Sequence, residues 1–180
     1  MIEKYYFSAR EVTFKKLVIF DRDDTLIRDV PNLKSVSDIN WLPGRLGILK
    51  ALSEQSTLIA IATNQSAIGR GLLSVEEFES ISEAIRRQLK ENGISLWGLV
   101  ACPHMPFENC GCRKPKPGLL NRLVEVAQRS DLEIFFVGNA DSDMEAAKAS
   151  RFQISGVKIE PTSLNGFENI LNSRAEAKGK

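Results

Sequence analysis

Two carboxylates one residue apart come directly after an apolar run near the start of the chain. The run is Leu17–Phe20, and the acids are Asp21 and Asp23. A run rich in β-branched residues predicts a buried strand, and ligands of open α/β sheets bind at the carboxyl ends of the strands. Neighbouring anionic groups repel unless a cation or a proton shared with a substrate offsets their charge. We therefore interpret Asp21 as a nucleophile and Asp23 as a general acid/base, with an Asx-rich turn as the alternative.

A second apolar run, Leu58–Ala62, also ends in small polar residues, Thr63-Asn64-Gln65-Ser66. A hydroxyl group and successive backbone N–H groups at a strand end can hold a phosphate group. The alternative is an ordinary turn after the strand.

Acidic residues follow a later apolar run, Ile134–Val137, within the segment Gly138–Asp143. Acids at this strand end can complete a cation site with Asp21, because magnesium prefers hard oxygen ligands and keeps several waters. Asp141 or Ser142 can alternatively cap the N-terminus of the helix that follows.

A basic loop stiffened by prolines, Arg113–Gly118, leads into an amphipathic segment that predicts a helix. Pro117 suits the start of that helix. A lysine fixed in such a loop, Lys114, can neutralise phosphate charge and steady an attacking carboxylate. The alternative is a solvated basic loop.

All three cysteines and the only histidine lie close together in the sequence. They are Cys102, His104, Cys110 and Cys112. This set has the ligands of a closed tetrahedral zinc site, and we predict a structural Zn²⁺ there. Disulfide pairing would leave one cysteine over, and nothing else in the segment resembles the surroundings of a catalytic Cys–His pair. The metal would fold a loop that lacks its own core and would hold Arg113 and Lys114 beside the strand ends.

The composition is that of an ordinary globular domain. The 180 residues are 43% hydrophobic and 26% charged, and the formal net charge is +1. That balance gives no overall field to attract nucleic acid or an anionic membrane. Without a long apolar run or a signal-peptide layout, we expect a cytoplasmic protein, and without an obvious partner helix we expect a monomer. We expect one domain over residues 17–172, between an N-terminal extension (1–16) and a C-terminal tail (173–180).

Strand-like and helix-like segments alternate along the chain. This indicates a Rossmann-like α/β fold, a parallel sheet with helices on both faces, without a large cap domain. The expected strands are Leu17–Phe20, Leu58–Ala62, Leu96–Ala101, Ile134–Val137 and Gln153–Val157. The expected helices lie near 44–54, 75–92, 117–130, 142–150 and 164–172. Ser74 and Glu77 predict a capping box at the start of the second helix.

Taken in order, these motifs resemble those of the haloacid dehalogenase superfamily of phosphohydrolases. The matching residues are Asp21-x-Asp23-x-Thr25, Thr63, Lys114 and Gly138-x-x-x-x-Asp143. The resemblance covers residues 17–158, and the ordered set is far more specific than any of its members. It implies magnesium-dependent hydrolysis of a phosphomonoester through an aspartyl-phosphate intermediate.

The resemblance also implies a role for each matched residue. Asp21 attacks phosphorus, Asp23 moves the proton, and Lys114 balances the phosphoryl charge. The implied magnesium ligands are Asp21, the Asp23 backbone carbonyl and Asn139, with Asp143 as a further candidate. Thr63 is implied as a further catalytic residue, which holds the transferring phosphoryl oxygens together with the backbone of Asn64. The implied substrate contacts are made by Thr25, Asn64, Gln65, Ser66, Arg70 and Arg113.

The Cys/His segment narrows the resemblance to a zinc-loop branch of the superfamily, which contains heptose bisphosphate phosphatases and histidinol-phosphate phosphatases. Residues 63–71 and 113–118 look most like the heptose enzymes, which implies a small sugar bisphosphate as the substrate, most simply D-glycero-D-manno-heptose 1,7-bisphosphate at its 7-phosphate. The short gap between His104 and Cys110 is closer to the histidinol-phosphate enzymes.

Two residues depart from the family pattern. Asp24 stands where the family usually has glycine, and Asn139 stands where it usually has a magnesium-binding aspartate. The neutral ligand leaves three interpretations open: weakened catalysis, a natural homologue that binds a phosphorylated ligand without hydrolysing it, or an engineered substitution. A phosphatase of nucleic-acid ends is a further alternative, which the neutral overall charge and the lack of a basic, aromatic-studded groove disfavour.

Overall fold

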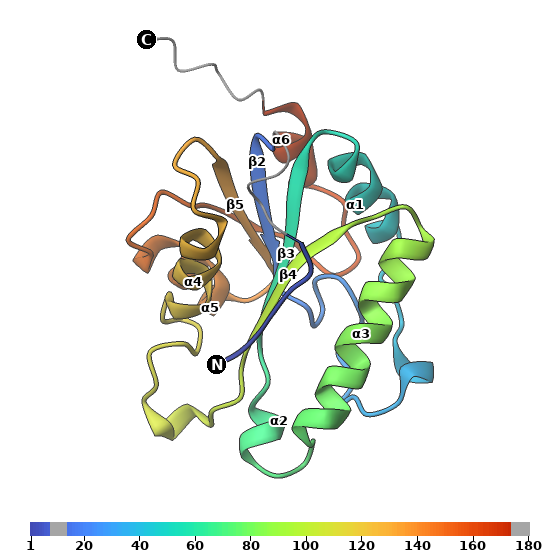
Figure 1. Cartoon of the computed structure of the whole chain (residues 1–180), viewed down its shortest axis with the longest axis vertical. Coiled ribbons are helices and arrows are strands. Elements are labelled where there is room, and N and C mark those ends of the chain that lie inside the picture. Colours follow the sequence, from blue (N-terminus) through green and yellow to red (C-terminus); the bar gives the residue numbers. More distant parts are fainter. Residues whose placement is uncertain (8–13, 174–180) are drawn as a thin grey trace.

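A single six-stranded sheet forms the centre of the molecule (Figure 1). The computed structural model describes residues 1–7 and 14–173. The spatial order of the strands is β1-β4-β3-β2-β5-β6, and only the edge pair β1–β4 is antiparallel. The strands are β1 (Ile2–Tyr5), β2 (Lys16–Phe20), β3 (Thr57–Asn64), β4 (Leu96–Cys102), β5 (Glu133–Gly138) and β6 (Ser155–Lys158). The predicted α/β architecture with a parallel sheet is therefore confirmed.

Helices cover both faces of this sheet, as the alternating pattern predicted (Figure 1). α1 (Arg45–Ser53) and α3 (Val75–Glu91) pack on one face, and α4 (Gly118–Ala127) and α5 (Asp141–Ala149) pack on the other. The remaining helical segments are α2 (Ser66–Gly69), α6 (Phe167–Asn172) and the 3₁₀ turns η1 (Val36–Asp38) and η2 (Pro106–Glu108). α2 and the loop after β4 lie at one end of the sheet, and α6 lies at the opposite end.

The central strand β2 supplies side chains to two separate hydrophobic cores. Val18 and Phe20 belong to the core beneath α1 and α3, whereas Leu17 and Ile19 belong to the core beneath α4 and α5. Successive side chains of a strand point to opposite faces, so a strand covered on both faces is apolar throughout. This is why residues 17–20 of β2 are all apolar, without an alternation of polar and apolar side chains.

The expected elements agree with the observed ones to within a few residues. The capping box of α3 is present, because Ser74 N–H donates to Glu77 Oε2 (2.7 Å) and Glu77 N–H donates to Ser74 Oγ (3.1 Å). The expected cap of α5 is wrong. Its N-cap residue is Ala140, and the carboxylate of Asp143, rather than Asp141 or Ser142, accepts the Ala140 N–H (3.0 Å).

Between Thr25 and Thr63, a stretch that the structure describes throughout, the chain forms only η1, α1 and β3, without a separate lid domain. None of the helices in the described part of the chain could cross a membrane. The expected domain limits remain a prediction, and residues 174–180 of the expected tail lie outside the described residues.

Candidate active site

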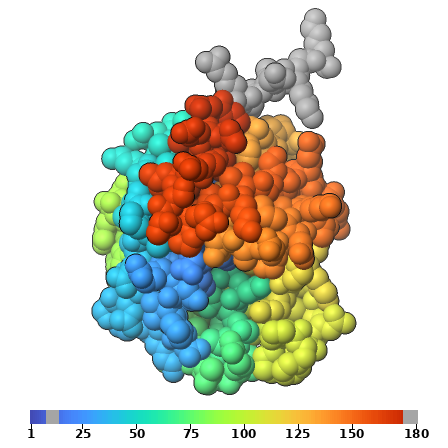
Figure 2. Space-filling model, turned by 180° about the vertical axis from the view of Figure 1, so that it is seen from behind, coloured from blue at the N-terminus to red at the C-terminus, as the bar shows by residue number. Residues whose placement is uncertain are grey.

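Three of the four predicted motifs lie at the carboxyl ends of neighbouring strands. Asp21 follows β2, Thr63 and Asn64 end β3, and Gly138 ends β5. Because β2 lies between β3 and β5 in the sheet and the three strands are parallel, these residues lie together at the carboxyl-terminal side of the sheet. Figure 2 shows the loops that follow β2, β3 and β4 side by side in the lower half of the molecule, in blue, green and yellow.

A buried lysine joins two carboxylates at this edge. Lys114 Nζ lies 2.6 Å from Asp21 Oδ1 and 2.7 Å from Asp143 Oδ1, and it also donates to the Ala62 carbonyl (3.2 Å). All three of these charged side chains are buried. The ring of Phe136 lies beneath the ammonium group, at 5.4 Å. A buried charge is tolerated only when it is paired and hydrogen-bonded, and here the ammonium group forms ion pairs with two carboxylates and donates hydrogen bonds to Asp21 and the Ala62 carbonyl.

The protonation of this group is set by opposing effects. Burial raises the pKa of Asp21 to about 6, and the nearby carboxylates of Asp143 and Asp23 act in the same direction while Lys114 opposes them. Burial alone lowers the pKa of Lys114, but Asp21 and Asp143 outweigh burial and the net shift is upward. The lysine therefore stays charged at neutral pH, and the surplus of carboxylates favours an additional cation.

Asp23 is held by two other side chains. Arg22 forms a fork on it, with Nε 2.9 Å from Oδ1 and an Nη 3.0 Å from Oδ2. Gln65 Nε2 donates to Asp23 Oδ2 (2.9 Å) and lies 2.9 Å from Thr63 Oγ1. Gln65 was expected to contact the substrate, but in this structure it connects the candidate acid/base to the end of β3. Arg22 was not among the predicted residues.

Asn64 fixes the backbone of the lysine loop. Its side-chain amide donates to the Lys114 carbonyl (3.1 Å), and its side-chain oxygen accepts the Lys114 N–H (3.1 Å). Two bonds to one residue set the direction from which Lys114 enters the site. The side chain of Asn64 therefore positions Lys114, which the sequence did not predict.

Asn139 lies beside the threonine of the first motif. Its Oδ1 accepts a hydrogen bond from Thr25 Oγ1 (3.3 Å). Asp141 cannot replace the missing charge in this conformation, because its side chain is 83% exposed and paired with Lys158 (2.6 Å). The preceding residue must be glycine, since a Cβ on Gly138 would overlap the side chain of Asp143.

The backbone conformation at position 24 explains why aspartate can stand at this place in the motif. Its φ is +52°, in the left-handed region that favours glycine but that aspartate also visits. Its Oδ1 accepts the Asp29 N–H (2.9 Å), which supports the turn. The aspartate therefore preserves the turn for which the family usually has glycine.

The donor set at the end of β2 and β5 fits magnesium. Lys114 engages Oδ1 of Asp21, which leaves Oδ2 for another ligand. Asp21 Oδ2, the Asp23 carbonyl and Asn139 Oδ1 are hard oxygen donors of the kind that magnesium prefers. Asp143 is less suited, because one oxygen pairs with Lys114 and the other accepts the Ala140 N–H.

The other expected substrate contacts lie at the rim of this edge. Arg70 is exposed and donates to Ser66 Oγ (2.8 Å), so these two side chains bind each other at α2. Arg113 donates to the His104 carbonyl (3.4 Å). In the part of the chain that the structure describes, neither arginine is hydrogen-bonded to Asp21 or Lys114.

The predicted Cys/His set converges on one point. The ligand atoms of Cys102, His104, Cys110 and Cys112 all lie within 4.8 Å of one another. The sulfur–sulfur distances are 3.2–3.6 Å, and His104 Nδ1 lies 3.5 and 3.3 Å from the sulfurs of Cys102 and Cys112. Tetrahedral zinc, with bonds of about 2.3 Å to sulfur and 2.0 Å to nitrogen, sets its ligand atoms about 3.5–3.8 Å apart. The cluster therefore fits zinc, and its sulfurs are too far apart for a disulfide.

Comparisons with known proteins agree with this geometry. A family model described as polynucleotide kinase 3 phosphatase matches residues 16–160. The chain is 37% identical over 135 residues to the D-glycero-beta-D-manno-heptose-1,7-bisphosphate 7-phosphatase of Pseudomonas putida, over 74% of this chain and 77% of the relative.

Solved structures show the same relationship. The crystal structure of D,D-heptose 1,7-bisphosphate phosphatase from B. bronchiseptica, complexed with magnesium and phosphate, matches with a TM-score of 0.69 and 31% identity, over 74% of this chain and 75% of that chain. A putative HAD-like phosphatase from Mesorhizobium loti matches in fold, with a TM-score of 0.75 and 21% identity, over 94% of this chain and 90% of that chain. The chain belongs to the family of haloacid dehalogenase-like phosphatases that includes the heptose-1,7-bisphosphate 7-phosphatases.

Proposed function

We propose that the protein hydrolyses a phosphomonoester by way of an aspartyl-phosphate. The observation that carries this proposal is the buried contact between Lys114 and Asp21 (2.6 Å) at a strand end, with Asp23 two residues further on. A carboxylate steadied by a fixed cation can present its free oxygen to phosphorus, and the same cation offsets charge on the phosphoryl oxygens.

The reaction then proceeds in two displacements. A carboxylate oxygen of Asp21 bonds to phosphorus as the bond to the ester oxygen breaks, and Asp23 gives its proton to the leaving alkoxide. A water molecule next attacks phosphorus, Asp23 takes up a proton from it, and the bond between phosphorus and Asp21 breaks. The products are the alcohol and inorganic phosphate. Thr63 and the backbone of Asn64 would hold the transferring phosphoryl oxygens.

Two metals complete this proposal. Magnesium would be held by Asp21, the Asp23 carbonyl and Asn139, and when bound it would supply positive charge to the phosphoryl group. Zinc would be held by Cys102, His104, Cys110 and Cys112, where its role would be structural. A metal measurement on the purified protein, with one zinc per chain expected, tests the second assignment.

We propose a small sugar bisphosphate as the substrate, and specifically D-glycero-D-manno-heptose 1,7-bisphosphate at its 7-phosphate. The names of the curated relatives and of the magnesium- and phosphate-bound neighbour support this choice. Arg70 and Arg113 are proposed contacts for the rest of the substrate, since a guanidinium fork suits phosphate. Phosphate release from both anomers of this compound and from histidinol phosphate tests it. Faster turnover of histidinol phosphate would overturn the substrate assignment, and a chain that binds substrate without turnover would favour the non-hydrolysing alternative.

Removal of a 3′-phosphate from a nucleic acid is a second candidate, favoured by the description of the matching family model. Its test is phosphate release from a 3′-phosphorylated oligonucleotide at two salt concentrations. Turnover comparable to that of the sugar bisphosphate, weakened by salt, would support this candidate.

We also propose that the protein is located in the cytoplasm and that its oligomeric state is a monomer. Three thiols arranged as metal ligands suit a reducing compartment. Size-exclusion chromatography with light scattering tests the monomer, and a mass of two chains would contradict it.

A further inference from the structure

Arg22 is a buried arginine placed between the two acids of the first motif. It is 4% exposed, and its fork engages both oxygens of the adjacent Asp23. Burying a guanidinium group carries an unfavourable desolvation free energy, which is offset only by close partners in good hydrogen-bonding geometry. The turn itself is fixed, because the Arg22 carbonyl accepts the N–H groups of Leu26 (2.9 Å) and Ile27 (3.1 Å). The fork is therefore built into the loop and differs from a mobile surface pair.

A second element holds the same carboxylate. Gln65 comes from the loop after β3, is buried, and donates to Asp23 Oδ2 (2.9 Å). The Asp23 side chain thus receives three hydrogen bonds, two from its own loop and one from the neighbouring strand end. Bonds from two elements fix both torsions of an aspartate side chain, which defines where its carboxylate can hand over a proton.

We propose that Arg22, with Gln65, is a positioning residue that holds Asp23 for proton transfer to the leaving group. This inference rests on the proposed function. In this proposal each acid is held by a different basic residue. Lys114 holds Asp21 for attack on phosphorus, and Arg22 orients Asp23 for proton transfer to the leaving group. Removing the fork should then impair the proton transfer and leave the attack largely intact.

Impaired proton transfer can be detected by comparing turnover of substrates whose leaving groups differ in their need for a proton. 4-Nitrophenolate leaves without a proton, whereas an alkoxide needs one from Asp23. Benzyl phosphate and 4-nitrophenyl phosphate are similar in size and differ in this need. A fault that merely loosens the fold would lower turnover of both compounds alike.

The experiment measures kcat/KM of the metal-loaded 180-residue protein for both compounds. This ratio reports the steps up to departure of the leaving group and excludes the later hydrolysis of the aspartyl-phosphate, in which Asp23 serves both compounds alike. Arg22→Lys keeps the charge and loses the fork, and Gln65→Leu removes the second support. Arg86→Lys is the matched control, because Arg86 makes a similar fork with Glu83 (Nε to Oε2, 2.8 Å) on the surface of α3. Arg22→Lys should lose about a hundredfold in kcat/KM on benzyl phosphate and less than about tenfold on 4-nitrophenyl phosphate. Gln65→Leu should show the same split, and Arg86→Lys should change neither.

A double variant sharpens the test. If Arg22 acts through Asp23, then Arg22→Lys should cause no further loss in an Asp23→Asn background. Equal losses on the two compounds, or additive losses in the double variant, would overturn the inference while leaving the proposed function in place. Should Arg22→Lys fail to fold, the split in Gln65→Leu decides. A wild-type chain that hydrolyses neither these compounds nor the sugar bisphosphate would overturn the proposed function, and this inference with it.

Discussion

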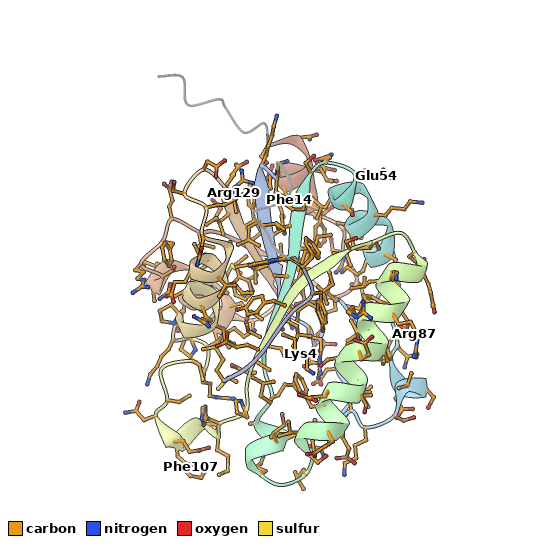
Figure 3. The ribbon with its side chains drawn as sticks, viewed as in Figure 1. Lys4, Phe14, Glu54, Arg87, Phe107 and Arg129 are labelled. Carbon is orange, nitrogen blue, oxygen red and sulfur yellow. The ribbon has the colours of Figure 1, made fainter. Side chains whose placement is uncertain are left out.

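The strand-end site and the Cys/His segment are both compact clusters of polar side chains, but different forces shape them. The site draws its residues from separate strands, whose positions two hydrophobic cores and the sheet already fix. The Cys/His set comes from residues 102–112, whose only helical turn is η2. Its Phe107 is 78% exposed and lies at the outer tip of the loop (Figure 3). The hydrophobic cores hold the first cluster in place, whereas the second lies in a segment with little secondary structure, which a bound ion would stabilise.

The largest effect is expected from a substitution that abolishes catalysis while leaving the strand-end site and the Cys/His cluster folded. Asp21→Asn should lower turnover by about 10⁴-fold or more, because the amide cannot serve as the nucleophile. Lys114 keeps Asp143 as its partner, and the zinc content should stay at that of the wild type. Phosphate release and metal analysis check this. Asp38→Asn, at an exposed position of η1, is the control. Activity within tenfold of the wild type would contradict the role of Asp21.

Cys112→Ser should break the second cluster first. We expect loss of zinc and a fall in stability of about 3 kcal/mol, which lowers the melting temperature by about 6–12 °C for a chain of this size. Turnover should fall too, because Lys114 is two residues further on. Zinc analysis and a thermal melt measure these effects. A zinc-free variant with wild-type melting and turnover would show that the sheet alone positions the lysine.

Gly138→Ala should disturb the first cluster without touching the second. The added Cβ would overlap Asp143 and push its carboxylate away from Lys114, at a cost of about 1–3 kcal/mol. Gly47→Ala is the matched control, because a Cβ at that position in α1 meets nothing within 4 Å. The control should gain about 0.5–1 kcal/mol in helix stability. Urea denaturation measures both, and changes of the same sign would contradict the packing argument.

The smallest expected effect is a pH dependence confined to the first cluster. The pKa of Asp21 is raised from an ordinary 3.8 to about 6, so the folded state holds this proton more tightly than the unfolded state. The stability from this group is complete below about pH 4 and is lost as the pH rises through about 6. Relative to Asp21→Asn in magnesium-free buffer, the wild type should therefore become less stable over that interval. Parallel curves for the two proteins would contradict the raised pKa.

The sequence predicted the strand ends and the Cys/His set because both depend on local patterns. An apolar run followed by acids, and four metal-binding side chains in one short segment, need no knowledge of distant contacts. The support around them could not be predicted in this way. Arg45, for example, is buried and donates to the carbonyls of Thr25 (2.8 Å) and Ser163 (2.7 Å), which are far away in the chain.

Side-chain partners were the other part that the sequence did not predict. Asp143 was a further candidate for a magnesium ligand and stays a prediction; in the structure one of its oxygens pairs with Lys114 and the other accepts the Ala140 N–H. Arg22 escaped notice because a charged residue beside two acids suggests a solvated turn, not a buried fork. The sequence did contain one indication that Arg22 is buried: the motif lies between two apolar residues, Phe20 and Leu26, and both of these are buried in the structure.

The alternation of β2 between two cores also limits how this protein can vary over evolution. Adding or deleting one residue between Leu17 and Asp21 would turn the β2 side chains on one side of the change toward the opposite core, or turn the nucleophile to the wrong face of the sheet. Fold and chemistry would be lost in a single event, which no nearby substitution could reverse. The loop over residues 27–42 has no such double constraint. Differences in length between relatives should therefore gather in that loop, where new substrate preferences can arise without putting the nucleophile at risk.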